Sequence, residues 1–89
     1  METILSLRRQ INHLDRALIQ LLAKRNRISN KIGVIKKRQG LAIHDRNRWQ
    51  ILMTRNIQIA KHYKLNSDLV KKIYKLIHED SIRIQNKQT

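Results

Sequence analysis

The 89-residue chain has no cysteine, no proline and no phenylalanine, and only two glycines, two tyrosines and one tryptophan. Without cysteine it can form neither disulfides nor thiolate metal sites. Because turn formers and β-favouring aromatic residues are scarce, the composition predicts an all-helical fold. No apolar run approaches the ~18 residues that a membrane-spanning helix needs. The first residues also lack the apolar segment of a secretory signal, so we expect a cytoplasmic protein.

Acidic residues are also scarce, with 6 Asp and Glu against 20 Lys and Arg, which gives a net charge of +14. Such an excess of positive charge is typical of nucleic-acid-binding proteins. The basic residues are nevertheless spread along the whole chain, with no block of five or six and no aromatic residues between them. This distribution disfavours a nucleic-acid partner, but a field of this sign attracts a small dianion.

Apolar residues recur in steps of three and four along the first 35 residues, and Arg25 interrupts them. This apolar stripe comprises Ile4, Leu7, Ile11, Leu14, Leu18, Leu21, Ile28, Ile32 and Ile35. The spacing places the stripe on one face of a continuous helix, which we expect to be buried. Because a guanidinium keeps its proton and an unpaired buried charge is costly, an anion must meet Arg25. The anion is either Asp15 or Glu79, in a structural ion pair, or a ligand.

The first helix is expected to run from about Thr3 to Gln39 and to end at Gly40. At ~1.5 Å per residue it would be ~55 Å long. A compact domain of this size has a radius of gyration near ~12 Å, so the helix would extend beyond its own protomer. The apolar stripe therefore needs a second chain. We expect a helical homodimer in which the two long helices pack against each other.

Two further helices complete the predicted fold, a single domain over residues 1–89. Asp45 is a good N-cap for a helix from Arg46 to Tyr63. Asn66 or Ser67 is expected to cap a third helix over residues 68–85, and a polar, frayed tail covers residues 86–89. The third helix has its own stripe, which comprises Leu69, Val70, Ile73, Leu76, Ile77, Ser81 and Ile84.

Four polar residues fall on faces that packing alone would make apolar: Arg25, Lys36, Ser81 and Gln85. Lys36 follows Arg25 by three helical turns, or ~16 Å, and Gly33 between them removes a side chain that would obstruct a pocket. Each residue alone has an ordinary explanation, since a lysine snorkels and a serine fills tight helix contacts. Together, in a chain so poor in acidic residues, they favour a pocket for an organic dianion.

The order and spacing of these residues resemble the all-helical chorismate mutases over nearly the whole chain. The matching segments are Leu7–Asp15, Leu21–Arg25, Ile32–Lys36, Asp45–Arg48 and Ile77–Gln85. The resemblance implies an intertwined homodimer of three-helix protomers with two equivalent active sites. The implied reaction, chorismate to prephenate, is a unimolecular rearrangement that requires no nucleophile, metal or redox cofactor.

The resemblance also implies roles for particular residues. The positions matching Arg25, Arg48 and Ser81 hold the carboxylates of the substrate. The position matching Arg8 reaches into the site of the partner protomer. Nothing in the residue pattern itself distinguishes Arg8 from other surface arginines, so that assignment rests on the resemblance alone.

At the centre of the implied site, the positions matching Lys36 and Gln85 contact the ether oxygen of the substrate. The position matching Asp45 lies near the hydroxyl of the substrate ring. We expect all three, with Trp49, to bind substrate, and Lys36, Gln85 and Arg25 to carry catalysis. The four histidines show no spacing typical of metal ligands; they are His13, His44, His62 and His78.

Trp49 departs from the family, which usually has glutamate directly after the arginine at position 48. An indole keeps one N–H donor but is larger and uncharged. Trp49 either packs at the helix boundary, with the ring hydroxyl held by the backbone of Asp45, or it changes the substrate or the reaction. Isochorismate pyruvate lyases also lack this glutamate, but they tend to have an aromatic residue where this chain has Ser81.

Three alternatives to the chorismate mutase reaction therefore remain open. One is the lyase reaction on the same scaffold, and another is an amino analogue of chorismate as substrate, which the missing carboxylate disfavours. The third is a basic helical binding module without activity. Ser81 and its neighbours favour the mutase.

Overall fold

The structure, a computed structural model, describes residues 1–87, and all regular structure in this part of the chain is helical. The helices are α1 (Ile4–Gln39), α2 (Arg46–His62) and α3 (Ser67–Asn86). The predicted all-helical fold with a very long first helix is thus confirmed. The third helix extends one residue further at each end than predicted. Of the predicted tail, residues 88–89 lie outside the described residues.

Each helix begins at a side chain that caps its free backbone N–H groups. Thr3 caps α1, Asp45 caps α2 and Asn66 caps α3, and in each case a side-chain oxygen accepts a backbone hydrogen bond from the first turn. Asp45 was predicted for this role, and of the two candidates for α3 the structure selects Asn66. At the other end of α1, Gly40 adopts a left-handed conformation with φ 66° and ψ 28°, which a glycine accepts without strain.

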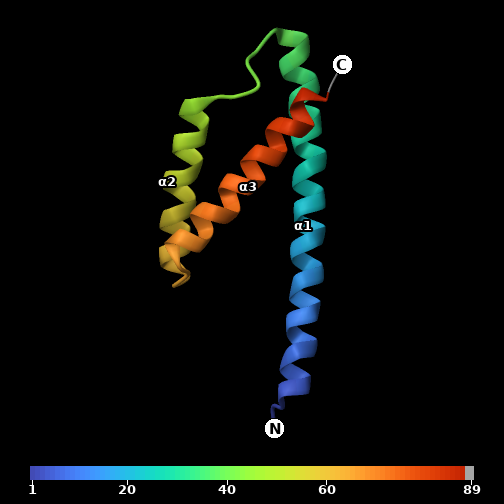
Figure 1. Ribbon diagram of the computed structural model, residues 1–89, viewed down its shortest axis with the longest axis vertical. Coiled ribbons are helices and arrows are strands. Elements are labelled where there is room, and N and C mark those ends of the chain that lie inside the picture. Colours follow the sequence, from blue (N-terminus) through green and yellow to red (C-terminus); the bar gives the residue numbers. More distant parts are fainter. Residues whose placement is uncertain (88–89) are drawn as a thin grey trace.

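The three helices form an elongated molecule with extents of 58 × 25 × 15 Å and a radius of gyration of 16.4 Å. Helix α3 packs against both α1 and α2. Figure 1 shows α3 crossing the C-terminal half of α1, while the N-terminal part of α1 projects beyond the other two helices. None of the described helices is both long enough and apolar enough to cross a lipid bilayer.

The apolar stripe of α1 is exposed in the single chain, and its expected burial against a second chain stays a prediction. Its apolar members range from 40% exposed at Leu7 to 70% exposed at Ile4. The buried residues of α1 are instead Ser29 and Gly33. The reason is geometric: α3 covers a neighbouring face of α1, and only in its C-terminal half.

Few apolar side chains are fully buried within residues 1–87, where the buried hydrophobic residues are Ala60 and Val70. The stripe predicted for α3 is only partly covered, since Leu69, Ile73 and Leu76 remain exposed. A single chain therefore buries little apolar surface, and burial of such surface is the main source of folding free energy.

Gly33 marks the closest approach of α1 to α3. A Cβ atom added to Gly33 would lie 2.8 Å from the Cα atom of Gln85. That distance is below any normal carbon contact, so only glycine permits this packing. The prediction that Gly33 lacks a side chain in order to keep a pocket open is therefore wrong. The missing side chain instead makes room for the backbone of α3.

Substituting Gly33 by alanine tests this contact. We expect Gly33→Ala to lower the free energy of unfolding by about 1–3 kcal/mol, because α3 must move away from α1. Urea denaturation at one fixed protein concentration measures the change. Gly40→Ala is the control, since its positive φ costs about 1 kcal/mol but nothing lies within 4 Å of the new Cβ. Equal stability of Gly33→Ala and wild type would contradict the assignment.

Candidate functional site

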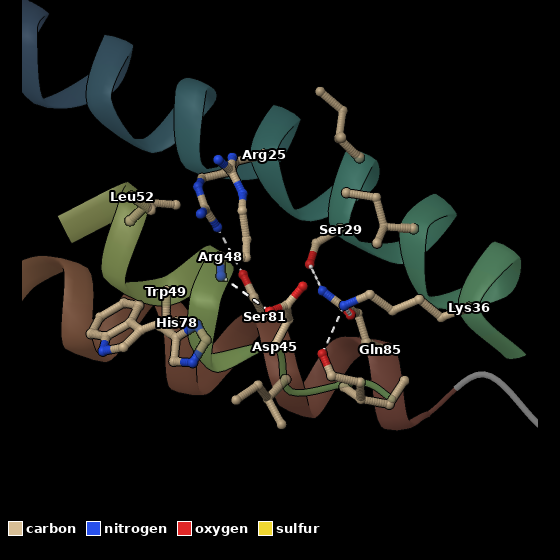
Figure 2. Close-up of a pocket in the computed structure, with 14 residues that line it drawn as sticks. Arg25, Ser29, Lys36, Asp45, Arg48, Trp49, Leu52, His78, Ser81 and Gln85 are labelled. Carbon is tan, nitrogen blue, oxygen red and sulfur yellow. Dashed lines mark hydrogen bonds between the residues drawn. The ribbon is translucent and has the colours of Figure 1, made fainter. Parts of the chain in front are cut away.

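A cavity of about 360 Å³ lies among the three helices and the connection between α1 and α2. Seven of the eight predicted site residues line it, and they are Arg25, Lys36, Asp45, Arg48, Trp49, Ser81 and Gln85. They come from all three helices or their caps, and Figure 2 shows their side chains gathered around the cavity. Tertiary packing thus brings together residues as far apart in the sequence as Arg25 and Gln85.

A chain of hydrogen bonds joins Lys36 to Gln85 across the α1–α3 contact (Figure 2). The Lys36 Nζ donates to Gln85 Oε1 at 2.9 Å and to the backbone oxygen of Ile43 at 2.7 Å. The Gln85 Nε2 in turn donates to Ser29 Oγ at 3.1 Å. An ammonium and a side-chain amide have more N–H groups than these bonds use, so Lys36 and Gln85 each keep one donor for a ligand.

Ser29 was not among the predicted site residues. It is buried one helical turn after Arg25, and its hydroxyl accepts the hydrogen bond that orients Gln85. The sequence carries a weak signal for it, because Arg25, Ser29 and Gly33 are spaced by four and share a helix face. That face, rather than the apolar stripe, is the one that α3 covers.

Arg25 is half-buried, and its Nη1 donates a hydrogen bond to Ser81 Oγ at 2.7 Å. Neither Asp15 nor Glu79 pairs with it. The one ion pair within residues 1–87 joins Arg83 to Asp80 at 2.8 Å, on the exposed side of α3. The structural ion pair considered for Arg25 is therefore absent from this part of the chain, and most of its five N–H donors remain open to a ligand.

Asp45 and Arg48 line the cavity from the first turn of α2. One oxygen of the Asp45 carboxylate accepts the backbone N–H of Arg48 at 3.1 Å, so the helix cap also places this carboxylate at the cavity edge. Arg25, Lys36 and Arg48 are the cationic side chains of the lining, and Asp45 is its single carboxylate. The cavity is therefore net positive, which favours an anionic ligand.

Trp49 lies half-buried at the cavity edge, where its indole stacks on the imidazole of His78. The ring centroids are 4.2 Å apart, with an angle of 26° between the planes. His78 Nε2 lies 3.3 Å from His44 Nδ1, within hydrogen-bonding distance. His78 lines the cavity but was missed in the sequence, because the histidines were considered only as metal ligands and the stacking arises from tertiary packing.

The imidazole of His78 favours its neutral form. Partial burial lowers the pKa of His78 most, and the nearby His44, Arg25 and Lys36 lower it further, while Glu79 acts in the opposite direction. Both effects disfavour a positive charge on the ring. His78 therefore adds a neutral polar group to the lining, beside Ser29, Ser81 and Gln85.

Arg8 is the one predicted site residue that does not line the cavity. It is exposed, and it lies on the part of α1 that projects beyond α2 and α3. Arg8 precedes Arg25 by 17 residues, which corresponds to about 25 Å along the helix axis. Within its own chain it is therefore out of reach of the cavity.

No group of three His, Asp or Glu side chains within residues 1–87 is arranged to hold a metal ion. The polar groups that converge on the cavity from the three helices and their caps are mainly hydrogen-bond donors, and three of them are cationic. The fold and the cavity together define a small all-helical domain with a net positive cavity that suits an organic anion.

Comparison with known protein families shows to which family of this class the chain belongs. The model of the chorismate mutase type II family matches residues 7–86. The chain therefore belongs to the chorismate mutase type II family. The resemblance noted in the sequence is thereby confirmed.

The relatives of the chain include both longer and similar-sized proteins. A bifunctional chorismate mutase/prephenate dehydratase of Buchnera aphidicola subsp. Schizaphis graminum is 33% identical over 84 residues, which are 94% of this chain and 22% of that protein. The Escherichia coli K12 protein of the same name is 32% identical over 82 residues, 92% of this chain and 21% of that one. The chain thus spans about a fifth of these relatives. A chorismate mutase of Methanocaldococcus jannaschii is 24% identical over 84 residues, 94% of this chain and 85% of that one.

The stability of an Arg25→Met variant distinguishes a ligand-binding arginine from a structural one. Breaking a buried ion pair costs about 3–5 kcal/mol, because it leaves a charge unpaired. Since Arg25 has no carboxylate partner within residues 1–87, we expect the free energy of unfolding to change by less than about 1 kcal/mol. Lys71→Met, at an exposed position of α3, is the charge-matched control. A loss of several kcal/mol in Arg25→Met alone would show that the arginine is structural.

Proposed function

We propose that this chain is a chorismate mutase, which converts chorismate to prephenate. The observation that carries the proposal is the convergence of Arg25, Arg48 and the Lys36–Gln85 pair on one net positive cavity. Chorismate is a dianion with one carboxylate on its ring and one on its enolpyruvyl chain. Family membership supports the same activity, and neither the lyase reaction nor a binding module is favoured by any observation.

The two arginines suit the positioning of the substrate. In the rearrangement the enolpyruvyl chain folds over the ring, a carbon–carbon bond forms and the ether carbon–oxygen bond breaks within one molecule. Arg25 from α1 and Arg48 from α2 approach the cavity from different helices, so each can hold a different carboxylate. Fixing both ends of a flexible substrate in the reactive geometry lowers the entropic part of the activation free energy.

Lys36 and Gln85 suit the stabilisation of the transition state. Negative charge grows on the ether oxygen as its bond to the ring lengthens, and no proton has to move. Each of the two side chains keeps an N–H donor beyond those in their mutual network, and that network holds them in place before substrate binds. A fixed donor aimed at developing charge contributes about 3 kcal/mol.

We further propose that the three helices act as a single domain within an intertwined homodimer, with Arg8 of each chain entering the cavity of the other. The exposed apolar stripe of α1 supports a dimer, because water contact with so long an apolar surface is unfavourable. The projection of α1 beyond its own protomer supports the exchange of Arg8. The cavity would then gain a third arginine.

An assay with two substrates tests the proposed function. The protein is incubated separately with chorismate and with isochorismate, and the products are identified. Prephenate from chorismate is the expected result. Salicylate and pyruvate from isochorismate would instead assign the lyase reaction, and no turnover together with salt-sensitive DNA binding would assign a binding module.

Lys36→Ala tests the catalytic assignment within the cavity. We expect kcat for chorismate to fall by at least about a hundredfold, because the variant loses a donor to the ether oxygen. Circular dichroism checks that the fold is retained. Lys37→Ala removes the same charge from the next, exposed residue outside the cavity and is expected to keep wild-type kcat. Wild-type-like kcat in Lys36→Ala would refute the assignment.

Mixed dimers test the contribution of Arg8. Arg8→Ala and Lys36→Ala chains are each expected to be nearly inactive. When they are co-expressed with different tags, random pairing gives dimers in which one of two sites has both residues intact, so about a quarter of wild-type activity should return. Gel filtration checks the dimer. A mixture no more active than the separate variants would show that Arg8 does not act across the interface.

A further inference from the structure

Trp49, His78 and His44 form a cluster at the cavity that the proposed mechanism does not use. Trp49 comes from α2, His78 from α3 and His44 from the connection before α2. Trp49 covers one face of the His78 imidazole, and His44 binds its Nε2. His44 and His78 are also in ring contact, with centroids 5.2 Å apart. The imidazole of His78 is therefore held from two sides.

The second ring nitrogen of His78 is open to a ligand. With Nε2 engaged by His44, Nδ1 has no partner within residues 1–87. No buried side-chain nitrogen or oxygen in this part of the chain lacks a hydrogen bond, so Nδ1 is accessible rather than sealed in the interior. Because His78 lines the cavity, a bound molecule can reach it.

The charges around His78 indicate which part of a ligand it suits. Arg25 and Lys36 from α1 and Arg48 from α2 supply the positive charge of the cavity, and they match the carboxylates and the ether oxygen of chorismate. Chorismate has one further polar group, the hydroxyl of its ring, which is uncharged. A neutral imidazole matches a neutral hydroxyl, since it can donate or accept one hydrogen bond without a charge to desolvate.

We propose that His78 is a specificity-determining residue that hydrogen-bonds the ring hydroxyl of chorismate through Nδ1, with Trp49 and His44 holding the imidazole in place. This inference rests on the proposed chorismate mutase function. Trp49 then has a supporting role, because its indole holds the imidazole in place while His78 of α3 contacts the hydroxyl. Because the three cations of the lining outnumber its one carboxylate, the same subsite would disfavour an ammonium group in place of the hydroxyl.

Two variants separate hydrogen bonding from packing. His78→Phe keeps a ring that can stack on Trp49 but has no nitrogen, and we expect kcat/KM for chorismate to fall about tenfold, the effect of one hydrogen bond. His78→Asn places an amide near the position of Nδ1 and is expected to recover most of that loss. A purely structural role predicts the reverse order, since phenylalanine preserves the stacking and asparagine does not.

The hydroxyl itself is tested with chorismate whose ring hydroxyl is replaced by hydrogen, which can neither donate nor accept a hydrogen bond. Wild type should lose about tenfold in kcat/KM with this substrate, whereas His78→Phe should lose little more, because its contact is already absent. Equal losses in the two proteins would show that His78 does not contact the hydroxyl, and so would overturn the inference.

His62→Phe is the matched control. His62 ends α2, its ring meets that of Tyr63 edge-on at 5.0 Å, and it does not line the cavity. This variant should keep wild-type kcat/KM with chorismate and the wild-type response to the substrate that lacks the hydroxyl. A comparable loss in His62→Phe would show that the effect at position 78 is not specific to the cavity.

The outcomes distinguish this inference from the proposed function. Trp49 is the only tryptophan in the chain, so its fluorescence reports chorismate binding at the cluster directly. If wild type converts chorismate and His78→Phe matches it in kcat/KM, the inference is wrong and the proposed function stands. If wild type neither converts chorismate nor shows a fluorescence change with it, both are wrong.

Discussion

The close contact of α1 with α3 at Gly33 is the constraint on which the rest of the structure depends. Because the added Cβ of any other residue would lie 2.8 Å from the Cα of Gln85, the two backbones meet directly. That approach brings Lys36 and Ser29 within hydrogen-bonding distance of Gln85. Four residues earlier on α3, Ser81 meets Arg25. One glycine thus aligns these three polar contacts between α1 and α3, and the cavity opens beside them.

The cavity lining carries more positive charge than its one carboxylate neutralises. Arg25 binds a hydroxyl rather than a carboxylate, Lys36 binds an amide and a backbone oxygen, and Asp45 is the single carboxylate of the lining. Uncompensated charge of this kind destabilises an empty protein, and a bound dianion relieves it. In the proposed function the same groups serve binding and catalysis, because they are fixed by hydrogen bonds before the substrate arrives.

The single chain is also incomplete as a folded unit. Its fully buried apolar residues within the described part are few, while the apolar stripe of α1 is exposed from Ile4 to Ile35. In the proposed homodimer, the surface that stabilises the fold and the residue that completes the site, Arg8, lie on the same helix. Stability and activity would then both require the second chain. Trp49, the departure from the family pattern, lies inside one protomer, where it supports His78.

The sequence by itself determined the three helices and two of their caps, since periodicity and the residues Gly40 and Asp45 act locally along the chain. It also indicated seven residues that line the cavity, because polar groups on apolar faces are visible in the pattern and the family resemblance added the others. Only the tertiary structure decided that Gly33 faces the backbone of α3, that Arg25 meets Ser81 and no carboxylate of residues 1–87, and that His78 stacks on Trp49. These facts depend on which face of one helix meets another, and residue spacing within a helix does not specify that.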